Sequence, residues 1–134
     1  MRQRPLTQKN EYYIPKEDYL TVLHYSRRYP LWLAEIQDAA DTATAIRYDK
    51  APVQTSGTSD PTHEAAVRIE GISAKVRTID DLIESIGQDL GKWLKLGVCY
   101  GLTYDQLKGR GMPCERQLYY SMRRRYYFEL AKKI

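Results

Sequence analysis

Apolar residues recur at helical spacing over two long stretches of the chain. The first stretch steps by three and four residues, which is the spacing of a helix that packs along another helix. Its positions are Tyr19, Val22, Ser26, Tyr29, Leu33, Ile36, Ala40 and Ala43. Pro30 lies inside it. Because proline removes one backbone hydrogen bond and crowds the preceding turn, the sequence predicts a kink or a split there.

The second stretch has the most regular pattern in the chain. It steps by four and three throughout, at Ala65, Ile69, Ile72, Val76, Ile79, Ile83 and Ile86. Asp60 and Pro61 precede it, and these residue types favour the N-cap and the first position of a helix, so we expect a helix to begin there. Residues 48–60 have no periodicity and contain glycine, proline and hydroxyl residues, which indicates a flexible connector.

This regular seam requires a partner, and two alternatives exist. The first helix can fold back antiparallel, with Ala40 and Ala43 facing Ala65 and Ile69 near the connector. A second copy of the chain can also pack on the seam, because β-branched residues suit intermolecular coiled coils and a two-helix hairpin has a thin core. We expect both contacts, and therefore a homodimer or higher homo-oligomer.

The pattern changes after Gly87, where we place a domain boundary, although the helix could also continue through it. A new apolar cluster follows at Leu90, Trp93, Leu94, Leu96 and Val98. Thr103 and Gln106 have the spacing of a capping box, which predicts a short helix over 103–108. A glycine turn and a long helix from about Cys114 come next. A helix over about 88–99, the short helix, the turn and the long helix have the order of a helix-turn-helix, whose last helix lies in the major groove of DNA.

Positive charge is concentrated in the same region. Residues 108–134 contain eight Lys or Arg against two acidic residues, whereas the other 107 residues contain 13 basic and 15 acidic ones. A basic module on a slightly acidic body points to a polyanionic partner, first of all double-stranded DNA. The alternative is that the arginines only form the solvent-exposed face of a helix and bind no partner.

The predicted long helix offers one apolar stripe and one basic face. Leu118, Met122, Tyr126 and Leu130 follow one another at steps of four, and we expect them to pack against Trp93, Leu96 and Leu107. The predicted DNA-binding residues are Arg116 and Gln117 for base reading, Tyr120, Arg123 and Arg124 for the DNA backbone, Arg110 for a phosphate, and Tyr127 on the same outward face. At least two of Tyr119, Tyr126, Tyr127 and Phe128 are expected to be aromatic core.

Other function classes find less support. His24 and His63 fall on different predicted helices, and no nucleophile turn, phosphate loop or metal-ligand spacing lies near them, so we expect no enzyme activity. Cys99 and Cys114 are expected to be reduced, inert thiols, and neither a metal nor another cofactor is expected. No apolar stretch is long enough for a membrane span and no signal peptide is recognisable, which predicts a cytoplasmic protein without a membrane partner.

Three segments resemble the phage transcriptional regulators of the RinA and ArpU type. They are residues 12–16 (YYIPK), residues 57–62 (GTSDPT) and residues 116–133 (RQLYYSMRRRYYFELAKK). The resemblance implies a phage or prophage activator of late genes in a bacterial host, with a C-terminal helix-turn-helix similar to region 4 of sigma factors and host RNA polymerase as a further candidate partner. Where that family has a proline-containing break before the tryptophan, this chain has Ile86, Gly87 and Gln88.

The sequence therefore predicts an all-α protein with three parts. These are a mobile tail over 1–11, an antiparallel, coiled-coil-like helical hairpin for oligomerisation over 12–87, and a helix-turn-helix over 88–134. The main alternative is a phage DNA-packaging component such as a small terminase subunit, although that class usually places its DNA module first. A helical interaction protein with no DNA role is a second alternative.

Overall fold

The computed structural model describes the backbone of residues 10–49 and 61–134 and the side chains of residues 10–42 and 63–134. The described residues form α1 (Lys16–Arg27), α2 (Tyr29–Asp49), α3 (Pro61–Gly87), the 3-10 helix η1 (Gln88–Leu90), α4 (Gly91–Val98), α5 (Tyr104–Gly109) and α6 (Arg116–Lys133). No strand occurs in these ranges. The prediction of an all-α protein is confirmed at this level.

Several predictions fall partly outside the described residues. They concern residues 1–9 of the tail, residues 50–60 of the connector with the cap Asp60, and the side chain of Ala43. Asn10 and Glu11, which we assigned to the tail, instead belong to a turn in which the Tyr13 amide donates to the Asn10 carbonyl (3.0 Å). The Tyr12 ring then packs edge-on against Phe128 of α6, at a centroid distance of 5.7 Å.

The predicted interruption of the first helix at Pro30 is confirmed as a split. α1 ends at Arg27 and α2 begins at Tyr29, so the break falls two residues before the proline. Proline has no N–H to donate to the carbonyl four residues earlier, which is that of Ser26, and its ring crowds that turn, whereas the missing N–H causes no loss in the first turn of a helix. Pro30 therefore begins a new helix rather than bending an old one.

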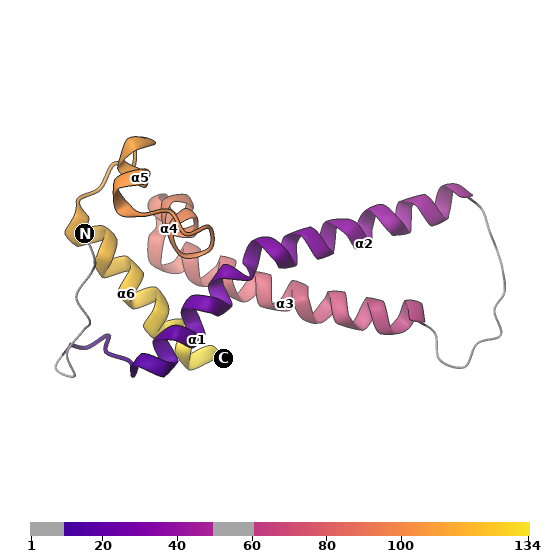
Figure 1. Ribbon diagram of the computed structural model, residues 1–134, viewed down its shortest axis with the longest axis horizontal. Coiled ribbons are helices and arrows are strands. Elements are labelled where there is room, and N and C mark those ends of the chain that lie inside the picture. The colour runs from indigo at the N-terminus through magenta and orange to yellow at the C-terminus, as the bar shows by residue number, and fades with distance from the viewer. Residues whose placement is uncertain (1–9, 50–60) are drawn as a thin grey trace.

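α3 is the central element of the molecule (Figure 1), and it contacts α2, α4 and α6. α2 runs antiparallel to it, because Tyr29 pairs with Asp80 while Glu35, further along α2, pairs with Arg68, further back along α3. Figure 1 shows α2 and the N-terminal half of α3 projecting from a body that contains α1, α4, α5 and α6. The C-terminal half of α3 lies within this body.

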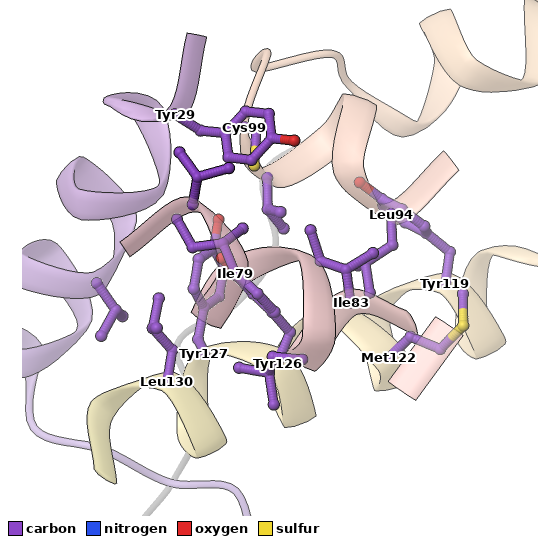
Figure 2. Close-up of a cluster of buried hydrophobic side chains, with 14 of the residues drawn as sticks. Tyr29, Ile79, Ile83, Leu94, Cys99, Tyr119, Met122, Tyr126, Tyr127 and Leu130 are labelled. Atoms are coloured by element: carbon purple, nitrogen blue, oxygen red, sulfur yellow. The ribbon is translucent and has the colours of Figure 1, made fainter. Parts of the chain in front are cut away.

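The hydrophobic core surrounds that half of α3 (Figure 2). Ile79 and Ile83 of the predicted seam are buried together with Leu94 of α4 and with Tyr126 and Leu130 of α6. Of the other seam positions, Ile72 and Val76 are buried, Ile69 and Ile86 are half-buried, and Ala65 is exposed. Much of the isoleucine seam is therefore buried by other helices of the same chain. Sequence periodicity did not show that α4 and α6 would pack against it.

The close approach of the two helices near the connector stays a prediction, but it buries no alanine among the described side chains. Ala40 and Ala65 are both exposed, so they form no buried alanine contact. A surface ion pair between Arg68 and Glu35 (3.1 Å) joins the helices in this region instead. Exposed pairs of this kind contribute little to stability, so the outer part of the α2–α3 pair is held more weakly than its base.

The long helix does not continue past Gly87. α3 ends there, Gln88 adopts a positive φ of 48°, and one turn of 3-10 helix leads into α4. A left-handed conformation is unfavourable for a residue with a Cβ atom, and it breaks the helix. Although the geometry changes at the predicted boundary, buried residues from both sides of Gly87 form one hydrophobic cluster.

Two polar contacts cross this core. The Ser26 hydroxyl donates to the Val22 carbonyl (2.9 Å) and so accepts from the hydroxyl of Tyr126 (2.8 Å), which joins α1 to α6. Asp80 of α3 accepts from the Tyr29 hydroxyl (2.8 Å) and pairs with the Lys95 ammonium (2.8 Å), which joins α2 and α4. Buried polar groups such as the hydroxyls of Ser26 and Tyr126 require partners, and the partly exposed contacts of Asp80 add a second link between the helices.

Candidate nucleic-acid interface

α4, α5 and α6 follow one another through short connections, as the sequence predicted. The capping box that starts α5 is present. The backbone N–H of Gln106 donates to the Thr103 hydroxyl (3.2 Å), and the backbone N–H of Thr103 donates to the side-chain oxygen of Gln106 (2.9 Å). Two amides that would otherwise lack partners are satisfied, which explains why a helix of only six residues forms here.

The turn between α5 and α6 presents Arg110 to solvent. Leu107 and Met112 are fully buried on either side of it, and the Met112 amide donates to the Leu107 carbonyl (3.1 Å). Gly111 has a φ of +99°, a conformation that glycine adopts without strain. The turn is therefore anchored at both ends, and Arg110 at its tip is exposed, as expected for a phosphate ligand.

Arg116 and Gln117 begin α6 and are both exposed. The guanidinium of Arg116 lies 3.3 Å from a carboxylate oxygen of Asp105 and 4.9 Å from the centre of the Tyr104 ring, so it bridges α5 and α6. This pair is solvent-exposed, and such pairs contribute about 0–1 kcal/mol. Arg116 can therefore exchange Asp105 for a base or a phosphate at little cost.

The rest of α6 is rotated relative to the predicted helical wheel. Leu118, expected in the core, is 49% exposed, whereas Tyr119 is 1% exposed. Met122, Tyr126 and Leu130 are buried as predicted. A step of four residues advances about 400° around a helix, so each such step drifts by about 40°. The stripe that starts at Tyr119 begins with a step of three, which offsets part of this drift, so its residues stay on one face. This spacing was the feature of the sequence that could have identified the buried face of α6.

The rotation corrects the predicted DNA-facing set. Tyr127 is 3% exposed and points into the core (Figure 2), so its assignment to the outward face is wrong. Tyr120, Arg123 and Arg124 are half-buried. The guanidinium of Arg123 lies 5.6 Å from the Tyr127 ring centre, and its Nε is buried without a hydrogen-bond partner in the described part of the chain.

Burial raises the pKa of the core tyrosines of α6, and this effect outweighs the lowering effect of the nearby Arg123 guanidinium. It raises the pKa of Tyr119 to about 12 and that of Tyr127 above its ordinary value. With Tyr126, three of the four aromatic residues named in advance are core, so the expectation of at least two is confirmed.

The outward face of α6 includes residues that were not predicted to bind. Ser121 and Arg125 are exposed one and two turns after Gln117, and Lys132 and Lys133 are exposed at the end of the helix. Glu115 provides no side-chain cap, and the first turn of α6 contains no acidic residue. The positive end of the α6 dipole favours an anion, whereas the acidic side chain of Glu115 at the N-cap opposes one.

The remaining candidate chemical groups do not converge on a site. His24 and His63 are exposed on α1 and α3. Cys99 is buried, and burial raises the pKa of its thiol to about 12. Within residues 10–49 and 61–134, no group of three or more His, Cys, Asp or Glu could hold a metal ion. In the same ranges, no helix has the length and apolar character needed to cross a membrane.

Comparisons of the chain with models of protein families, with curated proteins and with solved structures found no match.

Proposed function

We propose that this protein is a sequence-specific DNA-binding transcription regulator, in which α4, α5 and α6 act as a helix-turn-helix and the N-terminal half of α6 enters the major groove. The proposal is carried by one observation. The turn before α6 and the first three turns of its outward face present Arg110, Arg116, Gln117 and Arg125 to solvent. Cations and polar side chains in this arrangement suit phosphates and base edges.

The contact set is revised by the rotation of α6. Arg116 and Gln117 read base edges, while Arg110 and Arg125 contact phosphates. Arg124, which is half-buried, lies at the edge of this face. The resemblance to RinA and ArpU regulators supports activation of late phage or prophage genes as the biological role.

The projecting α2–α3 pair is the proposed oligomerisation module. Its outer part exposes Ala65 and Val67, the latter at 55%, and leaves Ile69 half-exposed. A second copy of the chain would cover these residues, and a dimer would place two DNA-binding modules on two half-sites at high effective concentration. Sedimentation gives the mass directly: a dimer supports regulation, whereas a ring of eight or more subunits favours a packaging component.

The DNA proposal is tested by fluorescence anisotropy on duplexes selected from a random pool. The Arg116→Ala variant should lose about 1–3 kcal/mol on the selected site and much less on random DNA. The Arg125→Ala variant should weaken binding to both equally and flatten the salt dependence by about one unit. Arg77→Ala on α3 is the matched control, because Arg77 is also exposed but lies outside this face. If the parent protein binds no duplex at low salt, the proposed function is wrong.

A further inference from the structure

A second group of exposed cations lies where α1 meets α2. Arg27 is the last residue of α1 and Arg28 is its C-cap, and Lys75 of α3 lies over the same tryptophan ring as Arg28. The guanidinium of Arg28 is 6.0 Å and the ammonium of Lys75 is 5.5 Å from the centre of the Trp32 ring. None of these three cations forms an ion pair with a carboxylate in the described part of the chain. We call Arg27, Arg28 and Lys75 the elbow patch.

Helix stability explains only part of this arrangement. A cation in the last turn of α1 interacts favourably with the helix dipole, which accounts for Arg27. Arg28, the C-cap of α1, shares this stabilisation, but it also immediately precedes α2, whose partly positive N-terminal end contains no acidic residue in its first turn. Lys75 lies in the middle of α3, where no helix terminus compensates its charge. Like charges that lie close together destabilise a folded protein, and an anionic partner relieves this repulsion.

Arg27 brings one end of the elbow patch next to the segment that leads into α5. The Arg27 side chain lies against Gly101, where an added Cβ atom would be 2.8 Å from the guanidinium carbon. Gly101 has a φ of +77° and precedes the α5 cap, Thr103, by two residues. Beside it, Tyr100 is 45% exposed, and its ring packs edge-on against Tyr29 at 6.4 Å. The first helix of a helix-turn-helix crosses the DNA backbone, so a basic surface beside α5 is suitably placed to contact phosphates.

We propose that the elbow patch is a second DNA-backbone contact, which binds phosphates that flank the site read by α6. This inference rests on the proposed function and extends it from one helix face to a second surface of the protein. DNA is a better match than an acidic protein because Arg27 of the patch contacts the segment that leads into α5 of the DNA-binding module, where Tyr100 is exposed. Contacts of this kind position a protein on the duplex without reading its sequence.

The test is the salt dependence of duplex binding by the double variant Arg28→Gln/Lys75→Gln. Glutamine keeps most of the side-chain length, and neither cation forms a hydrogen bond or ion pair in the described structure. Arg27 is left unchanged because it packs against Gly101. The matched control is Arg77→Gln/Lys16→Gln, which removes two exposed charges elsewhere on the protein. Circular dichroism melting establishes that both variants are folded.

We expect the elbow variant to weaken binding to selected and random duplexes alike and to flatten the slope of log K against log salt by about two units. The control should change the slope by much less. A parent protein that binds with a steep slope, together with an elbow variant of unchanged slope, would overturn the elbow patch as a DNA contact and leave the proposed function intact. Loss of binding to an acidic polypeptide but not to DNA would also overturn it. A parent that binds no duplex would overturn both proposals.

Discussion

Gly97 of α4 makes room for the ring of Tyr119, and its replacement by alanine should destabilise the protein. A Cβ atom added at Gly97 would collide with the Tyr119 hydroxyl and would lie 3.0 Å from the ring carbon that carries it. Tyr119 is 1% exposed, and the rings of Tyr104 and Tyr120 pack against it at centroid distances of 5.9 and 5.4 Å. The ring therefore has little space into which it could withdraw.

Two opposing effects set the magnitude. Alanine is better than glycine in a helix interior by about 0.5–1 kcal/mol, whereas overpacking of a well-filled core costs about 1–3 kcal/mol. We expect Gly97→Ala to destabilise by about 1–2 kcal/mol. Gly71 in α3 is the matched control, because a Cβ there meets no atom within 4 Å. Gly71→Ala should stabilise the protein by about 0.5–1 kcal/mol.

Removal of the clashing hydroxyl should rescue the variant. The Tyr119 hydroxyl is buried without a hydrogen-bond partner in the described structure, so Tyr119→Phe should be neutral or slightly stabilising. When Gly97→Ala is combined with Tyr119→Phe, it should lose at least about 1 kcal/mol of its cost. Urea unfolding followed by circular dichroism measures all four corners of this cycle. Equal stabilisation by Gly97→Ala and Gly71→Ala, or additivity within the cycle, would refute the packing argument.

Three further substitutions or conditions test the core. Ser26→Ala should destabilise the protein by about 1–3 kcal/mol because it leaves the buried hydroxyl of Tyr126 without its partner. Tyr126→Phe should cost less because the Ser26 hydroxyl retains its hydrogen bond to the α1 backbone. Burial raises the pKa of Tyr119 to about 12, above the value of 10.0 for a tyrosine in the unfolded chain. The stabilisation that comes from burying the neutral Tyr119 ring should therefore be complete below pH 10.0 and be lost as the pH rises toward 12. Unfolding in this range should coincide with the appearance of tyrosinate absorbance. Ile79→Asp would place a carboxylate at a fully buried position and should prevent folding at ordinary temperature. Ala74→Asp, at an exposed position five residues earlier in α3, should be tolerated in thermal melts.

The sequence alone determined the local elements. The split near Pro30 and the start of α3 at Pro61 follow from proline's fixed φ and missing donor, and these properties act on the adjacent residues. The capping box of Thr103 and Gln106 is equally local, because both of its hydrogen bonds lie within four residues. Effects of such short range are encoded where they act, and they could be predicted without knowledge of the fold.

Only the tertiary structure decided which face of each helix is covered and by what. The isoleucines of α3 require apolar neighbours, but their periodicity does not distinguish α2 from α6, and in the structure Ile79 and Ile83 lie in a core shared with α6. Within α6, the stripes that begin at Leu118 and at Tyr119 are both apolar. The choice between them depends on Gly97, a residue 22 positions away, whose missing Cβ admits the Tyr119 ring. Because that contact joins two helices, it sets the rotation of α6, and with it the residues that face a partner, only when the chain is folded.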